Sequence, residues 1–350
     1  MGMRILIVGA GVGGLTLAAL LRQRGLAPDI IDSAPSLAAK GHPLALHTLG
    51  SRVLHGLGMH RTFMNLSAPL GDDMRILDRA ELVSLLSRAG HQPEIRLGVS
   101  VTSLNSEDGR VGFSSGQDRA YDLVVAADGA RSQVRELIGS AVDRTRSRWM
   151  CLTWWSDRGR QERGAFEHAA GGRFVGLYAS PNRIAVVAAA PSRVLEGDGD
   201  KRKARMTRAF RKADAFSRAA LESLPPDVFW SPLTDSIARN WRKGRIVLLG
   251  DAACSFVPLA KIGAAMAMES AAVLADELSR SGRDGVPAAL ASFEKRRRHR
   301  IETVLDDSRK LGRNLTAGPN PVSWFRRRAY GSMTGEDFAR RMAAMLAGPI

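Results

Sequence analysis

Residues 3–21 read Met-Arg-Ile-Leu-Ile-Val-Gly-Ala-Gly-Val-Gly-Gly-Leu-Thr-Leu-Ala-Ala-Leu-Leu. This stretch predicts a short apolar strand, a glycine turn and the first turns of a helix. Gly9, Gly11 and Gly14 occupy the three positions of a G-x-G-x-x-G fingerprint. In that fingerprint the first glycine permits a tight turn, the second lets the backbone approach a pyrophosphate, and the third lets the helix pack closely on the strand. The stretch therefore predicts a dinucleotide-binding turn, with the phosphates at the positive end of the helix dipole.

A second apolar strand, Asp29-Ile30-Ile31-Asp32, follows and ends in an acid. Asp32 lies 18 residues after Gly14, close to the spacing of about 20 residues that is typical of a ribose-binding carboxylate. This context favours dinucleotide binding. The alternatives are a glycine turn without a ligand and an Asp32 that is only a polar strand end.

The totals describe an ordinary globular chain with an excess of positive charge. The 350 residues suffice for one large or two moderate cores, and 45% of them are hydrophobic. The formal net charge of +16 would favour anionic partners or surfaces. The arginines are scattered along the whole length, however, which favours a solvated basic surface. The densest basic run, residues 295–300, has no interleaved aromatic residues, so no nucleic-acid partner is expected.

The number of cysteines and the hydropathy of the chain indicate in which cellular compartment the protein is expected. Cys151 and Cys254 are the two cysteines, too few for a disulfide framework and suited to a reducing cytosol. The uncharged run over residues 5–21 is too short to span a bilayer, and its glycines match a phosphate loop. We therefore expect a cytoplasmic protein with no transmembrane segment.

The texture of the first 150 residues is that of an α/β protein. Helices are expected over residues 49–59 and 78–86, and strands over 95–104 and 111–113 around a turn at 107–109. Residues 121–129 read as a buried strand that runs into a sharp turn. Its continuous apolar character suits a parallel sheet covered on both faces.

From about residue 148 the pattern changes to an inserted antiparallel sheet. Strands are expected over 149–155, 164–168, 173–178 and 183–189, followed by helices over 202–224. Parallel-strand texture returns at 244–251, before helices over 263–279 and 288–312. The predicted domain segments are 1–70, 71–150, 151–235, 236–285 and 286–350.

Two further motifs follow the glycine turn. They are Asp-Gly-Ala-Arg-Ser-Gln-Val-Arg at residues 128–135, and Gly-Asp-Ala-Ala at 250–253 with Pro258 downstream. With the glycine turn they resemble, over nearly the whole chain, the single-component flavoprotein aromatic hydroxylases, the group A monooxygenases of the para-hydroxybenzoate hydroxylase family. The resemblance implies a Rossmann-like FAD-binding domain, an inserted antiparallel β-sheet substrate domain and a helical C-terminal region.

At the adenosine end, the resemblance implies that Asp32 holds the ribose and that Arg79 lies along the FAD. It also implies a backbone contact at Val101, and a role for Asp128 and Gly129 in serving both FAD and a transient nicotinamide. The residues alone leave alternatives open. Asp128 could only form a turn, and Arg79 could be a simple surface arginine.

At the ring end, Asp251 matches the acid that accepts hydrogen bonds from the ribityl chain, although it could merely cap the following segment. Pro258 matches the proline beside the isoalloxazine. The helix that begins near Gly263 would direct its N-terminal dipole at the N1/C2 region of the flavin.

The chain departs from this family after the proline. Many members have glycine, then glutamine or methionine, then glycine, whereas this chain has Lys261-Ile262-Gly263. Three alternatives stand for Lys261: it pairs with charge on the reduced flavin, it points to solvent, or it hinders tight FAD binding. Cys254, where histidine or tyrosine is usual, is expected to be a small buried residue.

The resemblance implies that NADPH or NADH reduces bound FAD. O₂ then adds at flavin C4a, and the distal oxygen of that hydroperoxide passes to an electron-rich ring or enol. The cofactor carries this chemistry, so neither a catalytic side chain nor a metal site is assigned. The candidate residues facing an aromatic or polyketide-like substrate are Trp154, His168, Arg173 and Tyr178, with ordinary packing or a surface position as the alternative for each.

The alternatives are another FAD oxidoreductase, either a dehydrogenase or an NAD(P)H oxidase, and a non-catalytic FAD-binding or partner-binding protein. A nicotinamide-only dehydrogenase is disfavoured, because it has no use for the second and third motifs. The identity of the substrate, the choice between NADPH and NADH, and the oligomeric state stay open.

Overall fold

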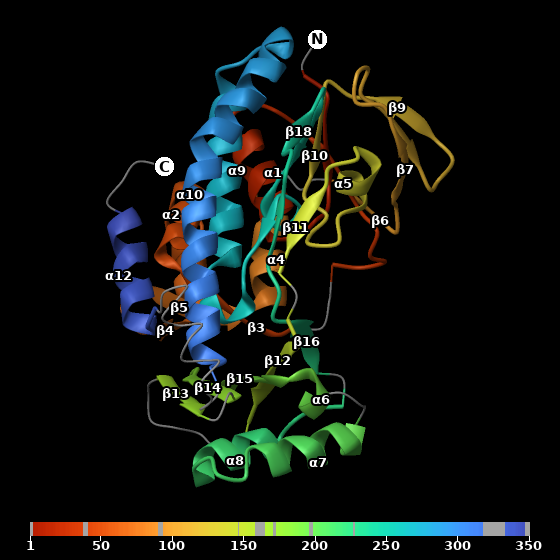
Figure 1. Ribbon diagram of the computed structural model, residues 1–350. Helices are drawn as coiled ribbons and strands as arrows, with labels where there is room; N and C mark the ends of the chain where they lie inside the picture. The colour runs from red at the N-terminus through yellow and green to blue at the C-terminus, as the bar shows by residue number, and fades with distance from the viewer. Residues whose placement is uncertain are drawn as a thin grey trace.

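The fold is described from a computed structural model that covers residues 3–37, 41–89, 94–145, 147–157, 165–170, 173–195, 199–226, 228–317 and 333–346. Figure 1 shows two layers of unequal size, a larger α/β part that carries the N-terminus and a smaller sheet with helices below it. The predicted α/β class with an inserted antiparallel sheet is confirmed.

The larger part is organised around a sheet in the order β18-β19-β10-β1-β2-β6. Its parallel strands are β19 (Ile246–Leu248), β10 (Leu123–Ala126), β1 (Ile5–Val8), β2 (Asp29–Asp32) and β6 (Ile95–Leu97). The two-residue strand β18 (Arg242–Lys243) pairs with it antiparallel. The three central strands are wholly buried, because layers cover both faces of the sheet.

Helices α1 (Val12–Gln23), α9 (Gly263–Ser279) and α10 (Val286–Leu315) gather on one side of this sheet (Figure 1). On the other side lie α5 (Gln133–Leu137) and a small sheet of β7 (Val101–Leu104), β8 (Arg110–Phe113) and β9 (Asp118–Ala120). Helix α9 begins and ends at the predicted residues, and α10 extends two residues before and three after its predicted span.

The expectation of one strand over residues 95–104 is wrong. The chain bends at Gly98, whose φ of +70° is in the left-handed region, so that β6 joins the parallel sheet and β7 pairs with β8. Two backbone hydrogen bonds hold the bend, from Gly98 to the Ala34 carbonyl (2.9 Å) and from Val99 to the Asp32 carbonyl (3.0 Å). Because of this bend, the residues that join β6 to β7 lie next to the end of β2.

A third sheet lies next to α9, in the order β3-β5-β4: β3 (Pro43–His47), β5 (Met74–Asp78) and β4 (Ala68–Leu70). Helices α2 (Thr48–Gly56), α3 (His60–Leu66) and α4 (Arg79–Ser87) pack with it. Asp78 caps α4 in a capping box with Glu81, which explains why the helix begins one residue later than predicted.

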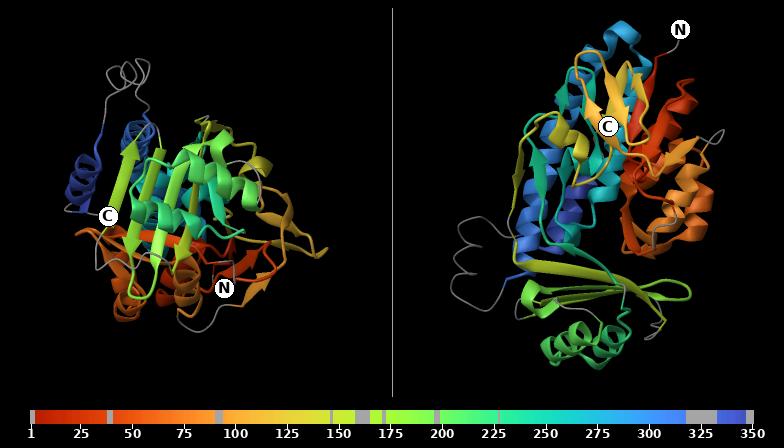
Figure 2. Two further views of the ribbon diagram at one scale, coloured as in Figure 1. Left: turned by 90° about the horizontal axis from the view of Figure 1, so that it is seen from below. Right: turned by 90° about the vertical axis from the view of Figure 1, so that its right-hand side faces the viewer.

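The inserted sheet has the order β13-β14-β15-β12-β16 and is antiparallel throughout. Its strands are β13 (Ala165–Ala170), β14 (Arg173–Ala179), β15 (Ile184–Pro191), β12 (Trp149–Ser156) and β16 (Phe229–Pro232). The sequence predicted the first four and missed β16. In the right panel of Figure 2 the parallel-sheet part lies above this sheet and the helices lie below it. We call these two sides its inner face and its outer face.

The outer face is covered by α6 (Ser192–Leu195), α7 (Gly199–Ala209) and α8 (Ala215–Glu222). Between the inserted sheet and the parallel-sheet part runs a small sheet of β11 (Val142–Arg144), β17 (Ser236–Ala238) and β20 (Cys254–Ser255). The predicted domain segments stay a prediction.

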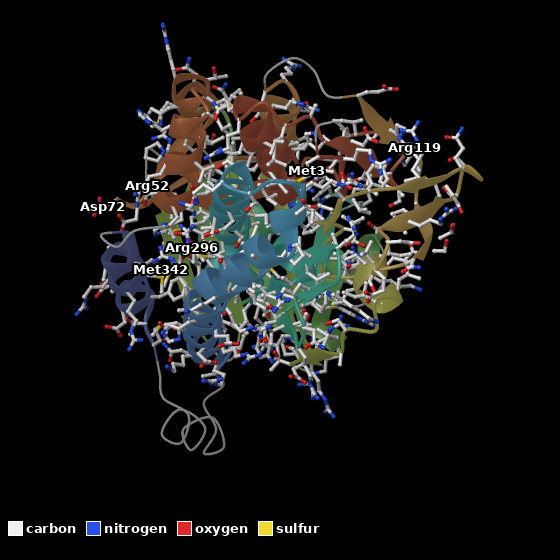
Figure 3. All side chains as sticks on the ribbon, turned by 90° about the horizontal axis from the view of Figure 1, so that it is seen from above. Met3, Arg52, Asp72, Arg119, Arg296 and Met342 are labelled. Carbon is white, nitrogen blue, oxygen red and sulfur yellow. The ribbon has the colours of Figure 1, made fainter. Side chains whose placement is uncertain are left out.

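The dense basic run of residues 295–300 lies within α10, and its four arginines form ion pairs. Arg297, with 1% of its side chain exposed, contacts the buried Glu269 at 2.7 Å, and Arg300 contacts the same carboxylate at 2.7 Å. Arg296 pairs with Asp276 at 2.7 Å. Figure 3 shows α12 (Gly335–Leu346), which carries Met342, lying beside the helix that carries Arg296. The run thus fastens the helical layer together.

Within the described residues, no helix combines the length and the apolar character that crossing a bilayer requires.

Candidate active site

The three motifs meet at one edge of the parallel sheet. Val8, Ala126 and Leu248 stand in register on neighbouring strands, and each motif begins directly beyond them. The carboxyl ends of parallel strands form one edge, which is where ligands bind in open α/β sheets. Segments more than 200 residues apart in the sequence are therefore neighbours.

Two of the three fingerprint glycines are required by the fold itself. Gly9 has a φ of +109°, and a Cβ there would lie 2.3 Å from the Ala127 carbonyl oxygen. A Cβ on Gly14 would lie 2.0 Å from the Gly9 carbonyl oxygen. Gly11 differs, because its nearest neighbour would be the Arg79 guanidinium at 3.9 Å. The N-terminus of α1 at Gly11 thus borders open space.

Asp32 ends β2 as predicted, and both of its carboxylate oxygens accept backbone hydrogen bonds. The Ala10 amide donates to Oδ2 at 2.7 Å, and the Ala34 amide donates to Oδ1 at 2.8 Å. Asp32 therefore fastens the glycine turn to β2. Each carboxylate oxygen can accept a second hydrogen bond, so this role leaves room for a ribose hydroxyl.

Arg79 is the residue that joins the motifs electrostatically. It is half-buried at the start of α4. Burial lowers the pKa of its guanidinium, and the negative charges of Asp32, Asp251 and Asp78 raise it by a smaller amount. Its guanidinium also lies beside Gly11. The alternative of a simple surface arginine is wrong: Arg79 stands between the glycine turn and the acid of the third motif.

Val101 begins β7, with 1% of its surface exposed and its side chain in the core. Its neighbour Val99 donates to the Asp32 carbonyl, so the strand passes next to the acid that ends β2. Only its backbone could face a ligand there.

Asp128 and Gly129 follow β10 at the same edge. Asp128 Oδ2 accepts a hydrogen bond from the Val134 amide at 3.1 Å, while its buried Oδ1 has no partner among the described residues. Burial raises the pKa of Asp128 and hydrogen bonds from Ser132 and Val134 oppose this. Gly129 has a φ of +85°. A buried, unpaired acceptor beside the open end of α1 is suited to a donor from a ligand.

Arg135, which sequence reasoning quoted but left without a role, ties the second motif to the third. Its buried guanidinium donates to the Ala252 carbonyl at 2.9 Å and to the Ala130 carbonyl at 2.8 Å. Burial lowers the pKa of Arg135 while the charges of Asp128 and Glu136 raise it, and backbone carbonyls accept the hydrogen bonds of its guanidinium. The sign of it in the sequence is its place as the last residue of the second motif.

Solvent reaches Asp251, yet protein atoms surround its carboxylate closely. Burial raises its pKa to about 6, and the charge of Arg79 lowers it. A side chain that is in contact with water but is also partly desolvated by the protein lies in a recess of the surface. A Cβ on Gly263, the first residue of α9, would lie 4.0 Å from Asp251 Oδ1, so the positive end of α9 faces this acid. Pro258 begins the short 3₁₀ turn between them.

This environment makes Asp251 costly for the cofactor-free protein. Its folded-state pKa of about 6 lies above the ordinary value of 3.8, so the folded protein binds more protons than the unfolded chain between these values. Stability therefore falls as pH rises through that window. We expect cofactor-free Asp251→Asn to be more stable than wild type at about pH 7, by about 1 kcal/mol after allowance for solvent access.

Urea unfolding at about pH 7 and about pH 4 tests this prediction. The advantage of Asp251→Asn should shrink at the lower pH, where the wild-type carboxyl is protonated. A variant that is less stable than wild type at the higher pH would contradict the assigned surroundings of Asp251.

Because successive side chains of a strand point to opposite faces, the predicted substrate residues are divided between the outer and the inner face of the inserted sheet. Trp154 packs on the outer face and donates from Nε1 to Ser223 Oγ at 3.1 Å. Arg173 shares this side with Val175, which packs against the helices. The expectation that Trp154 and Arg173 face a substrate is wrong, because both point away from the three motifs. The side chain of His168 lies outside the described residues.

Tyr178, with 1% of its surface exposed, lies on the inner face, and so do several residues that sequence reasoning missed. Trp155 Nε1 donates to Asp78 Oδ2 at 2.7 Å, and the Arg183 guanidinium stacks 3.8 Å from the Trp155 ring centre. Cys151 packs against Leu259 from the turn that precedes α9. Alternation places Cys151 and Trp155 on one face of β12, but it does not show that this face is the inner one, which depends on how the sheet is docked.

Lys261 crosses to this inner face. Its φ of +56° makes it the one non-glycine residue with positive φ in the described part of the chain. Its ammonium pairs with the Glu167 carboxylate and lies 4.6 Å from the Tyr178 ring centre. The Tyr178 hydroxyl donates to Glu167 Oε1 at 2.6 Å. With 17% of its side chain exposed, Lys261 does not point to solvent, and that alternative is wrong.

Both cysteines are buried and unpaired with each other. Burial raises the pKa of Cys151 to about 12 and raises that of Cys254 further. The expectation that Cys254 is a small buried residue is confirmed. Neither thiol is poised to react, because thiols react as thiolates.

Comparisons with known proteins agree with this geometry. Residues 98–308 match the family described as FAD binding domain, and residues 7–68 match the NAD(P)-binding Rossmann-like domain. The chain is 27% identical to 3-amino-4-hydroxybenzoate 2-monooxygenase of Streptomyces cremeus, over 97% of this chain and 98% of that protein. It is 26% identical to the FAD-dependent urate hydroxylase of Klebsiella pneumoniae, over 99% and 100% of the two chains.

The fold is also similar to that of solved structures. The crystal structure of Klebsiella pneumoniae HpxO complexed with FAD and uric acid aligns with a TM-score of 0.85 at 22% identity, over 99% of this chain and 97% of that chain. The chain therefore shares the fold of this solved structure.

Proposed function

The chain belongs to the FAD binding domain family, and from this premise we propose that it hydroxylates a small aromatic or enolic molecule between the inner face of the inserted sheet and the N-terminus of α9. It is an FAD-dependent monooxygenase that takes its electrons from NAD(P)H. The family resemblance expected from the three motifs is confirmed.

The residues at the sheet edge suit a dinucleotide with a diphosphate and a polyol linker. The unpaired Asp128 Oδ1 and the solvent-reached carboxylate of Asp251 are acceptors for hydroxyl groups, and Gly11 leaves space at the positive end of α1. We assign the following cofactor contacts: Gly9, Gly11, Gly14, Asp32, Arg79, Val101, Asp128, Gly129, Asp251, Pro258 and Gly263. Bound FAD would supply the chemistry that activates O₂.

The protein's own contribution is then positioning and electrostatics. The N-terminus of α9 places positive potential beside Asp251, where it stabilises an anion. Arg79 balances Asp32 and Asp251, so that the two acids can stay close to the phosphates. The aromatic and apolar inner face, with Trp155 and Tyr178, excludes water from the reacting atoms.

Lys261, Glu167 and Tyr178 form the polar part of that inner face. A cation, a carboxylate and a hydroxyl within contact distance can orient a phenolic or enolic hydroxyl group on the substrate. We propose that this trio, which contains the Lys261 that departs from the family pattern after the proline, sets the orientation of the aromatic or polyketide-like substrate against the cofactor.

Lys261 allows a test that needs no substrate. Its left-handed conformation lowers the free energy of unfolding by about 1 kcal/mol relative to glycine, which adopts this conformation without strain. We expect Lys261→Gly to be as stable as wild type within about 1 kcal/mol, because the relief of strain offsets the lost ion pair. Lys261→Met keeps the strain without the charge and should be less stable than Lys261→Gly by about 1 kcal/mol. Equal stabilities of the two variants in urea would refute the strained conformation.

The observation that carries the proposed function is the meeting of Gly11, Arg79 and Asp251 at one sheet edge. The test is to purify the protein, record its visible spectrum, and screen aromatic compounds for stimulation of NAD(P)H oxidation. Hydroxylated product in step with NAD(P)H consumed is the expected result. Hydrogen peroxide as the sole product with every compound would point instead to an NAD(P)H oxidase.

We further propose a cytoplasmic location and no nucleic-acid partner. The two unpaired cysteines suit a reducing compartment. Arg296, Arg297 and Arg300 of the densest basic run are engaged in ion pairs within the helical layer.

A further inference from the structure

A pocket of about 760 Å³ lies on the outer side of the inserted sheet, within the range of about 300 to 1,000 Å³ that is typical of small-molecule sites. It opens between α6, the start of β14 and the corner that joins α7 to α8. The cations that line it are Arg173, Arg193, Arg205, Arg208, Arg211 and Lys212.

This pocket is separate from the proposed active site. Arg173 shares the outer face with Val175, whereas its neighbour Phe174 packs on the inner face against Leu259. The sheet therefore lies between the pocket and the Lys261 trio. Figure 2 shows the helices α7 and α8 on the side of the sheet that faces away from the larger part.

The charge in the pocket is of one sign. None of its described lining residues is acidic. The nearest acid along the chain, Asp214, uses both carboxylate oxygens to cap α8, with Ser217 N at 2.9 Å and Ser217 Oγ at 2.6 Å. Arg173 Nε is buried and has no hydrogen-bond partner in the described structure. A buried N–H donor without an acceptor is costly, so the guanidinium at this wall is suited to an anion.

The floor of the pocket is apolar. Phe210 and Ala213 are buried members of the core between the sheet and the helices, and Val194 packs against the same core. Guanidinium groups match phosphate oxygens in paired hydrogen bonds. Cations at the rim and an apolar floor together suit a molecule that has both a phosphate group and an organic body.

We propose that this pocket binds a phosphorylated organic molecule, with its phosphate on the arginines of α6 and α7 and its organic part over Phe210. The phosphate can belong to a free metabolite or to a lipid headgroup. The site is independent of the cofactor contacts at the sheet edge.

The test uses the FAD-loaded protein, so that the diphosphate site is filled, and titrates it calorimetrically with inorganic pyrophosphate and with a sugar bisphosphate at low salt. Arg193→Gln and Arg208→Gln, one on α6 and one on α7, should each weaken binding by about tenfold, the loss expected for one charged hydrogen bond. Arg61→Gln is the matched control, because Arg61 is an exposed arginine on α3 and carries the same charge change.

Vesicles identify the source of the phosphate. Sedimentation with phosphatidylglycerol vesicles but not with phosphatidylcholine vesicles, reduced in Arg208→Gln, would assign the phosphate to a lipid. Titration by the sugar bisphosphate would assign it to a free metabolite. The proposal is overturned if the protein binds none of the three probes, which are pyrophosphate, the sugar bisphosphate and the phosphatidylglycerol vesicles. It is also overturned if Arg61→Gln weakens binding as much as Arg208→Gln.

Discussion

Replacing Gly11 with valine is expected to give a folded protein that has lost its cofactor. The nearest atom to a Cβ at Gly11 is 3.9 Å away, and the φ of −80° is open to any residue, so the fold accepts the side chain. The two valine methyl groups would then occupy the space where the diphosphate approaches the N-terminus of α1. We expect FAD affinity to fall at least about a hundredfold, which corresponds to about 2.7 kcal/mol.

Fluorescence titration of cofactor-free protein with FAD measures this loss, and far-ultraviolet circular dichroism checks the fold. A yellow Gly11→Val protein with wild-type FAD affinity would show that the diphosphate lies elsewhere. Loss of the fold would show that the open space at Gly11 is wrongly described.

Replacing Gly14 with alanine should have the opposite outcome, although it adds only one carbon to the same turn. A Cβ at Gly14 would lie 2.0 Å from the Gly9 carbonyl oxygen and 3.2 Å from a methyl carbon of Ile7. The first of these is backbone and is held by the turn, so helix α1 must move off the sheet. We expect the free energy of unfolding to drop by more than about 3 kcal/mol.

Urea unfolding of cofactor-free protein tests this, since FAD binding would otherwise add to the measured stability. The Gly11→Val protein serves as the control from the same motif. If Gly14→Ala unfolds at the same urea concentration as Gly11→Val, then α1 and β1 do not pack as closely as described.

The elements that short-range rules govern were predictable. The glycine turn, the acid at the end of β2 and helix α9 are each specified by residues within a few positions of one another. The inserted sheet was visible because its strands alternate and are separated by turns such as 180–183, where Ser180 donates to the Arg183 carbonyl.

What the sequence could not supply depends on long-range pairing. The bend at Gly98 follows from hydrogen bonds to β2, which local patterning does not show. The inner and outer faces of the inserted sheet are interchangeable until the sheet is docked, so alternation alone does not show that Trp154 and Arg173 lie on the outer side. The partners of Lys261 lie on β13 and β14, about 90 residues earlier in the chain.

The central claim is that the glycine turn, the Asp-Gly motif and the Gly-Asp motif close around one FAD. Equilibrium titration of the cofactor-free protein with FAD tests it most directly, with wild type and Asp251→Asn in parallel. The account predicts saturation at a single FAD per chain in wild type, and a loss in affinity of about tenfold in Asp251→Asn, because an acceptor for the ribityl hydroxyls is weakened. Wild-type protein that binds no FAD, or an Asp251→Asn variant with unchanged affinity, would contradict it.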